Sequence, residues 1–193
     1  SGGTTGRPKG VLLTNRNFVA EGRQVAAWAQ VGPGDSMLAI MPLFHGFGLG
    51  VCVNATLMAG AKAILVPTFT AEAVAELIRR KRPTFIAGVP TLYAALSADP
   101  SLERADLSCL RAAFSGAATL PANVKESFES LVRRRGGGVR LLEGYGLTEA
   151  VSAIMAMPTD GYRAGTIGVP FPDMDACICA PGTTDRAPPG TEG

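Results

Sequence analysis

The sequence predicts an α/β fold in which a mainly parallel sheet carries helices on both faces and short strands follow near the C-terminus. The first observation is order: short apolar runs alternate with segments of helical spacing, which is typical of βαβ units. The second is composition, because 47% hydrophobic and 18% charged residues exclude a disordered chain. The third is a net charge of only +2, which argues against a strongly basic nucleic-acid module, so no nucleic-acid partner is expected.

Strands are predicted where a short apolar run is bounded by glycine, proline or polar residues. These runs are Ser36–Met41, Ala61–Val66, Thr84–Gly88, Arg111–Phe114 and Val139–Leu142. Helices are predicted from apolar spacing and from residues suited to helix starts, namely Thr14, Thr70 and Pro121. The helical segments are Asn17–Gln30, Gly48–Met58, Thr70–Arg82 and Pro121–Arg135. The second of these is apolar nearly all round, so we expect it to be buried.

The character of the chain changes after Glu149, where prolines separate short segments such as Gly165–Val169 and Asp175–Cys179. These segments predict small strands or hairpins. Residues 1–150 are therefore interpreted as the core of the domain, and residues 151–193 as a short-strand segment at its edge.

The four cysteines do not indicate a disulfide scaffold or a zinc site. Cys52 and Cys109 lie in apolar surroundings, and Cys177 and Cys179 would face one side of a strand. His45 is the only histidine, so a zinc site would lack ligands. We expect reduced thiols and a cytoplasmic location. No apolar run reaches the ~18 residues that a membrane span requires.

The first motif with chemical meaning is the segment Ser1-Gly2-Gly3-Thr4-Thr5-Gly6-Arg7-Pro8-Lys9-Gly10. Small residues bring backbone N–H groups close to an anion, and hydroxyls with an ammonium suit phosphate. It is not a Walker A loop, because Pro8 and Gly10 stand where that loop needs glycine and Ser or Thr. A flexible turn is the alternative from composition alone.

Two further motifs follow predicted strands. In Met41-Pro42-Leu43-Phe44-His45-Gly46-Phe47-Gly48-Leu49, an aromatic–His–Gly–aromatic run could line an apolar pocket, although a lone histidine is more often structural. In Glu143-Gly144-Tyr145-Gly146-Leu147-Thr148-Glu149, the tyrosine offers a ring face, Thr148 a hydroxyl and Glu149 hard oxygen for Mg²⁺. The small-residue loop Ser115-Gly116-Ala117-Ala118 follows the preceding strand. Ligands of open α/β sheets bind beyond the carboxyl ends of strands, so these loops predict one site.

Taken in this order, the motifs resemble the adenylate-forming (AMP-binding) superfamily and are most similar to medium- and long-chain fatty acyl-CoA synthetases. The first segment is similar to that family's phosphate loop, and Gly144–Glu149 is similar to its Y-G-x-T-E motif. The resemblance implies that an acid attacks ATP to give an acyl-adenylate, and that coenzyme A then takes the acyl group. It implies that residues 1–150 form the nucleotide- and acyl-binding core.

The resemblance also implies a role for each matching residue. Thr4, Thr5, Gly6 and Lys9 would hold the β- and γ-phosphates of ATP. Tyr145 would stack on adenine in a slot lined by Gly116, Ala117 and Ala118. Catalysis would depend on Thr148 at the α-phosphate, Glu149 as the Mg²⁺ ligand, and His45. His45, Phe47 and Gly144 would contact the acid.

The resemblance implies that the chain is a central piece of the family's large N-terminal domain. The sequence preceding the phosphate loop and the mobile C-terminal lid domain would lie outside it, so we expect these residues alone to be inactive. The loop Ser115-Gly116-Ala117-Ala118-Thr119-Leu120 carries Ala and Thr where relatives often have Gly and Pro, and the extra methyl of Ala117 could narrow the adenine slot.

The substrate class is open within limits. The stretch Phe44–Leu49 holds no acid to pair with a substrate amine, which disfavours amino acids. Aryl acids, a carrier-protein acceptor and a non-catalytic nucleotide-binding module remain alternatives. Peripheral membrane contact would suit a fatty-acid enzyme, but no basic amphipathic helix supports it. The sequence does not indicate an oligomeric state.

Overall fold

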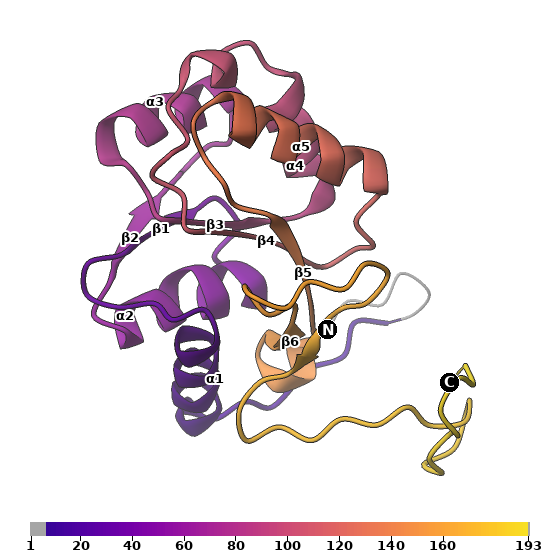
Figure 1. Ribbon diagram of the computed structural model, residues 1–193. Coiled ribbons are helices and arrows are strands. Elements are labelled where there is room, and N and C mark those ends of the chain that lie inside the picture. The colour runs from indigo at the N-terminus through magenta and orange to yellow at the C-terminus, as the bar shows by residue number, and fades with distance from the viewer. Residues whose placement is uncertain (1–6, 193) are drawn as a thin grey trace.

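The computed structural model describes residues 7–192, which contain a seven-stranded sheet of order β2-β1-β3-β4-β5-β6-β7 (Figure 1). The strands are β1 (Ser36–Ala39), β2 (Lys62–Leu65), β3 (Phe85–Gly88), β4 (Ala112–Ser115), β5 (Leu141–Gly146), β6 (Ala153–Ala156) and β7 (Val169–Pro170). The first five run parallel, and β6 and β7 continue the sheet antiparallel. The predicted parallel sheet is confirmed.

Helices cover both faces of this sheet, as predicted (Figure 1). One face carries α3 (Ala71–Lys81), α4 (Pro90–Ala98) and α5 (Ala122–Arg134). The other carries α1 (Asn15–Trp28), the π-helix η1 (Phe47–Ala55) and the single turn α2 (Thr56–Met58). Two single 3₁₀ turns, η2 (Leu102–Arg104) and η3 (Thr148–Ala150), complete the elements.

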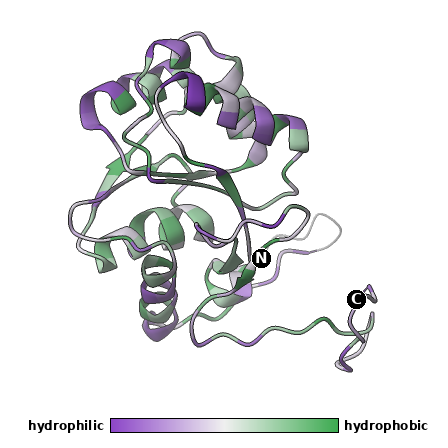
Figure 2. Cartoon of the chain, in the orientation of Figure 1, coloured by the Kyte–Doolittle hydropathy of each residue, from purple (hydrophilic) through white to green (hydrophobic). Residues whose placement is uncertain are grey.

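Alternation along the strands divides the buried side chains into two cores. Leu38 of β1 packs under α3–α5, whereas its neighbours Met37 and Ala39 pack against α1 and η1. This is the period of two that a strand imposes. In Figure 2 the sheet and η1 are mainly hydrophobic, whereas the outer faces of α1 and α3 are hydrophilic.

The sequence signals at helix ends are largely confirmed. The Thr14 hydroxyl accepts from the Asn17 backbone N–H at 3.3 Å, and the Asn17 side chain accepts from the Thr14 N–H at 2.8 Å. This reciprocal cap starts α1 at Asn15. Thr70 caps α3 by accepting from the Ala73 N–H at 3.1 Å. Pro121 is the cap residue itself rather than part of the first turn of α5.

Several expectations about the elements were wrong. Segment Gly48–Met58 is helical, as expected, but it is mostly a π-helix and only partly buried, because Leu49, Leu57 and Met58 are exposed. Helix α4 was not predicted, although Pro90 at its first turn was a usable signal. Segment Asp175–Cys179 forms no strand, but its last residues belong to a small hairpin, as one of the predicted alternatives, through the bridge from Cys179 to Arg186.

Near the C-terminus, Gly165–Val169 contributes only its last residue to β7. Among the described residues, no helix has the length and apolar character needed to cross a bilayer.

Candidate active site

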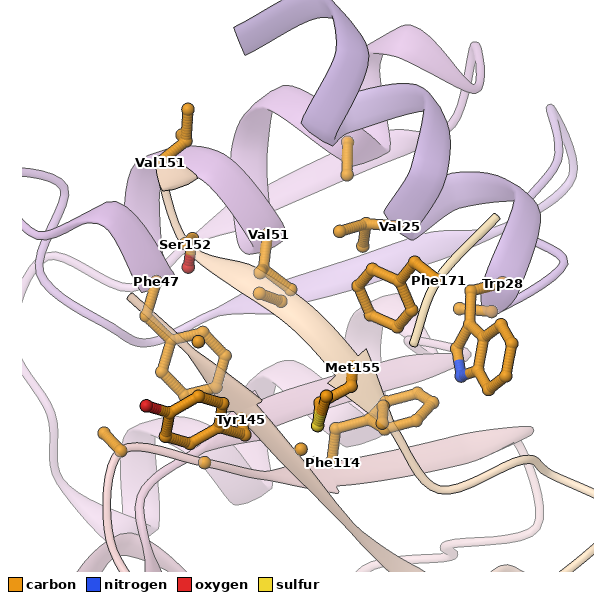
Figure 3. Close-up of a pocket in the computed structure, with 18 of the residues that line it drawn as sticks. Val25, Trp28, Phe47, Val51, Phe114, Tyr145, Val151, Ser152, Met155 and Phe171 are labelled. Atoms are coloured by element: carbon orange, nitrogen blue, oxygen red, sulfur yellow. The ribbon is translucent and has the colours of Figure 1, made fainter. Parts of the chain in front are cut away.

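A cavity of about 260 Å³ lies between the carboxyl ends of β4 and β5 and the helices α1 and η1. Figure 3 shows it as elongated, with Phe47 and Tyr145 at one end, Val51 and Met155 along it, and Trp28 and Phe171 at the other end. Its lining combines three of the sequence motifs. The predicted site residues in the lining are His45, Phe47, Gly116, Ala117, Gly144, Tyr145 and Thr148.

The loop after β4 gives the cavity a wall of bare backbone. A Cβ on Gly116 would lie 3.4 Å from the Gly144 carbonyl oxygen and 3.5 Å from the Phe47 ring, so a larger residue would crowd this wall. Ala117 has φ +67°, a left-handed conformation that favours glycine. The Ser115 hydroxyl is buried without a hydrogen-bond partner among the described residues. A buried, unpaired hydroxyl in a cavity wall is suited to a ligand.

The Y-G-x-T-E motif does not simply follow β5, as expected, but forms its end. Gly144 pairs with Ala156 and Gly146 with Ala153 of the antiparallel β6. A Cβ on Gly146 would lie 2.2 Å from the Ser152 carbonyl oxygen, so only glycine permits this approach. Tyr145 between them is 42% exposed at the cavity, as required of a ring that stacks on a planar ligand.

The turn after β5 carries Thr148 and is strained. Val151 has φ +72° and ψ −62°, and the Ser152 N–H donates to the Ala150 carbonyl at 2.9 Å. This is a γ-turn, which is costly for a β-branched residue. Such strain is characteristic of functional sites, where the surrounding structure holds it in place.

The glycines of the His–Gly–Phe–Gly run bring η1 against this strained turn. A Cβ on Gly46 would lie 2.1 Å from the Val151 carbonyl oxygen. A Cβ on Gly48 would lie 2.2 Å from the Pro42 carbonyl oxygen. Both glycines therefore serve the packing of backbone on backbone.

His45 is held as the tautomer protonated on Nε2. The Phe47 backbone N–H donates to Nδ1 at 3.0 Å, so Nδ1 is the acceptor and Nε2 carries the hydrogen. The imidazole is exposed at the cavity and is free to direct this donor outward. An N–H donor in that place suits a carboxylate oxygen.

Three of the predicted site residues do not line the cavity. Glu149 is exposed beside Thr148, and Lys9 and Ala118 are exposed; none of the three lines the cavity. Thr4, Thr5 and Gly6 fall outside the described residues. Among the described lining residues there is no Asp, Glu, Lys or Arg.

A buried carboxyl behind the strained turn was not found from the sequence. Glu21 of α1 is only 2% exposed, and neither of its oxygens has a hydrogen-bond partner among the described residues. A Cβ on Gly50 would lie 2.9 Å from its Oε1 and 3.2 Å from Ser152 Cβ, which places the carboxyl beside both segments. Burial raises the pKa of Glu21 to about 7; the Asn54 side chain and the Ala153 N–H are near enough to oppose part of the rise without reaching the geometry of a hydrogen bond.

Other lining residues were also missed by the sequence reasoning. They are spread over α1, β4, β6 and the segment after β7, so no local motif joins them. The main ones are Trp28, Phe114, Ser152, Met155 and Phe171. Trp28 and Phe171 contact each other with ring centroids 5.3 Å apart and close the apolar end.

Magnesium fits this site only together with a ligand. No group of three or more His, Cys, Asp or Glu side chains in residues 7–192 is placed to hold a metal ion. Mg²⁺ at nucleotide sites is usually bound by one or two carboxylates and by phosphate oxygens. The exposed Glu149 carboxylate beside the cavity fits that arrangement.

The cavity at the edge of the sheet, lined by these motifs, indicates the class of protein to which the chain belongs. The model of the AMP-binding enzyme family matches residues 1–193, and the chain belongs to this family. The resemblance to adenylate-forming enzymes is thereby confirmed. Among its relatives, the long-chain-fatty-acid–CoA ligase of Bacillus subtilis is 39% identical over 100% of this chain and 34% of its own length. A feruloyl-CoA synthase of Amycolatopsis is 34% identical over 99% of this chain and 38% of its own length.

Solved structures agree on the fold. The ATP-bound MatB from Rhodopseudomonas palustris superposes with a TM-score of 0.86 at 31% identity, covering 98% of this chain and 36% of MatB. A long-chain-fatty-acid-CoA ligase from Archaeoglobus fulgidus gives 0.86 at 27% identity, over 99% of this chain and 39% of the ligase. The chain therefore spans about a third of the length of these relatives.

Proposed function

We propose that the complete protein activates a carboxylic acid with ATP to form an acyl-adenylate and then transfers the acyl group to coenzyme A. The observation that carries this proposal is the convergence of Gly116, Tyr145, Thr148 and His45 on one cavity with an apolar end. The names of the relatives support it, since acid–CoA ligases stand among both the sequence and the structure matches.

Different residues along the cavity are suited to different parts of the substrates. The Tyr145 ring and the bare loop at Gly116 and Ala117 are suited to an adenine between them. The Thr148 hydroxyl is suited to the α-phosphate, and His45 Nε2–H to the carboxylate that attacks it. Phosphoryl-type chemistry depends mainly on positioning and on charge neutralisation. Mg²⁺ held by Glu149 would supply charge neutralisation at the phosphates.

Thr4, Thr5, Gly6, Lys9 and Ala118 are part of the same proposal. We assign the first four to the β- and γ-phosphates and Ala118 to the edge of the adenine slot. Their residue types, not a measured geometry, support these roles.

The proposed acid has an apolar body, and a medium- or long-chain fatty acid is the first candidate. The inner lining is formed by Val25, Val51, Met155 and similar side chains, with no acidic lining residue among those described. A substrate ammonium would be buried there without a counter-charge, which costs several kcal/mol. The likeness to the Bacillus subtilis ligase points the same way.

An aryl acid is the second candidate, favoured by the aromatic walls. Phe47, Phe114, Trp28 and Phe171 all line the cavity. An anthranilate CoA ligase superposes with a TM-score of 0.86 at 27% identity, and the feruloyl-CoA synthase is among the relatives. Flat aromatic side chains offer offset or edge contacts to an aromatic acid.

Acid-dependent ATP–pyrophosphate exchange by the complete protein tests the proposal. The acids are fatty, aryl and amino acids, each also assayed with coenzyme A or carrier phosphopantetheine as acceptor. Glu149→Gln should lower exchange by about 100-fold or more, as expected for loss of one group that stabilises the transition state. Glu126→Gln, an exposed glutamate on α5, is the matched control and should leave exchange unchanged.

The outcomes separate the alternatives. Exchange with fatty acids only supports the first candidate, and exchange with benzoate-type acids only supports the second. Exchange that survives Glu149→Gln contradicts the role given to that residue. No exchange with any acid, while ATP still binds, would instead support a nucleotide-binding protein without catalysis.

A further inference from the structure

A pair of thiols lies far from the cavity, on the segment that follows β7. This segment extends away from the sheet towards the C-terminus (Figure 1). Cys177 and Cys179 face each other with their Sγ atoms 3.7 Å apart. Cys177 is exposed, and Cys179 is half-buried.

A small hairpin holds one of the two thiols in place. The Ala187 N–H donates to the Ile178 carbonyl and the Ala180 N–H to the Asp185 carbonyl, both at 2.9 Å, on either side of the bridge between Cys179 and Arg186. The Cys179 Sγ also lies 3.8 Å from the Thr184 carbonyl oxygen, within hydrogen-bond distance for sulfur. Cys179 is therefore fixed by pairing on both sides.

The adjacent chain brings the second thiol to the same side. Residues two apart in an extended chain project to one face, which brings the Cys177 side chain to the side of Cys179. No third side chain among the described residues completes a metal site with them. Two close thiols with an accessible member and no metal partner are suited to thiol–disulfide exchange.

We propose that Cys177 and Cys179 are a reversible dithiol–disulfide pair that small-molecule disulfides of the glutathione class oxidise. This proposal does not depend on the proposed acid activation.

The exchange proceeds in two balanced steps. The Cys177 thiolate attacks one sulfur of the small disulfide, forms a mixed disulfide and releases one small thiolate. The Cys179 thiolate then attacks the Cys177 Sγ, which closes the Cys177–Cys179 bond and releases the second small thiolate. The two protein thiols lose two electrons and two protons in total, and the small disulfide gains both.

The order of attack follows from the surroundings of the thiols. The hydrogen bond to Cys177 and burial raise the pKa of Cys179, whereas Arg186 opposes part of the rise. Cys179 thus keeps its proton longer, and the exposed Cys177 is the first nucleophile. A ring closed over a single intervening residue is strained, which favours a bond that is easily reduced again.

The test uses the complete protein, reduced and then incubated with defined mixtures of oxidised and reduced glutathione. The reaction is quenched with acid, free thiols are alkylated, and peptides are analysed by mass spectrometry. We expect Cys177 and Cys179 to lose alkylation together, with loss of two hydrogens and no retained glutathione. Excess reduced glutathione should restore both thiols.

Single-cysteine variants show which thiol carries out each of the two steps. Cys179→Ser should retain one glutathione on Cys177, because the second attack is missing. Cys177→Ser should react about tenfold more slowly, because the remaining thiol, Cys179, is the less exposed of the two. Cys109→Ser is the matched control and should behave as the unmodified protein. Phenylarsine oxide, which bridges two close thiols, should protect both cysteines only when both are present.

Three results would overturn the proposal. They are retained glutathione on the unmodified protein at the level seen in Cys179→Ser, a disulfide that includes Cys109, and full alkylation of both thiols at every glutathione ratio. The substitutions at Cys177 and Cys179 do not touch the core, since neither residue is fully buried and serine is of similar size; Cys109 borders the core, so circular dichroism checks the fold of its variant. Misfolding is therefore not an explanation for such a result.

Discussion

The two faces of the sheet are built from the same strands but differ in how completely they are filled. Under α3–α5, side chains such as Phe128, Leu131 and Tyr93 are almost fully buried and contact one another. Tyr93 also donates from its hydroxyl to the Phe114 carbonyl at 2.7 Å. Under α1 and η1, the core encloses the cavity of about 260 Å³.

The second face also holds the unfavourable features of the molecule. They include the unpartnered carboxyl of Glu21, the γ-turn at Val151 and the left-handed Ala117 near the cavity. Each costs stability, whereas the packing of the first face supplies it. The filled face therefore supplies the stability that holds the strained groups of the site in place. Matched substitutions on the two faces test this difference.

The largest effect is expected from equivalent truncations on the two faces. Phe128→Ala should lower the free energy of unfolding by about 3–5 kcal/mol, because it opens a cavity in a filled core. Phe171→Ala should cost only about 2 kcal/mol, because its ring already borders a cavity and loses fewer contacts. Urea unfolding of the complete protein followed by circular dichroism measures both. Equal losses would contradict the difference between the faces.

The next effect is a pH dependence that belongs to the cavity face. The pKa of Glu21 rises from an ordinary 4.5 to about 7 in the folded state, so the folded protein binds the proton more tightly. The contribution of this bound proton to the free energy of unfolding is fully present below pH 4.5. It falls by about 3 kcal/mol as the pH rises through about 7. The difference in unfolding free energy between the unmodified protein and Glu21→Gln should therefore change across this range and be flat above it. A difference that is the same at every pH would show that Glu21 has no raised pKa.

A third substitution tests whether close packing of η1 on the strained turn supports activity. Gly46→Ala places a Cβ 2.1 Å from the Val151 carbonyl oxygen, so the turn that carries Thr148 must shift. A displacement of that kind should lower kcat/KM for acid-dependent exchange by about 100-fold. Gly34→Ala is the control, because nothing lies within 4 Å of its added Cβ. Full activity in Gly46→Ala would show that the turn tolerates movement.

The smallest effect concerns the left-handed residue in the loop after β4. Ala117→Gly should raise the free energy of unfolding by about 1 kcal/mol, because glycine adopts φ +67° without the steric cost of a Cβ. Ala118→Gly, next to it, is the control and should be neutral or slightly destabilising. Thermal unfolding of the two variants measures the difference, and equal shifts would mean that the loop carries no strain.

Many of the strands and two helix starts could be predicted from local sequence. The apolar runs located β1–β4, and Thr14 and Thr70 located the starts of α1 and α3, because period and capping act over a few residues. The fifth strand was predicted too short, since its final residues are held by β6, about ten residues further along the chain. Local periodicity contains no information about such a partner.

The motifs of the candidate site were predicted from the sequence, but the residues that close its apolar end were not. His45, Gly116 and Tyr145 were named from their residue types and neighbours, and the structure brings them to one cavity. Trp28 and Phe171 were not, because they are far apart in sequence and meet only when α1 packs beside the segment after β7.

The class of fold, most of the strands and the chemical types at the site could be predicted from sequence, because these depend on short-range patterns of polarity and on small residues in loops. Folding of the whole chain sets the burial of Glu21, the γ-turn at Val151 and the 3.7 Å between the Sγ atoms of Cys177 and Cys179. Each of these depends on backbone conformation or on segments that pack from different parts of the chain. Their free energies are therefore set by the whole fold and not by the residues that carry them.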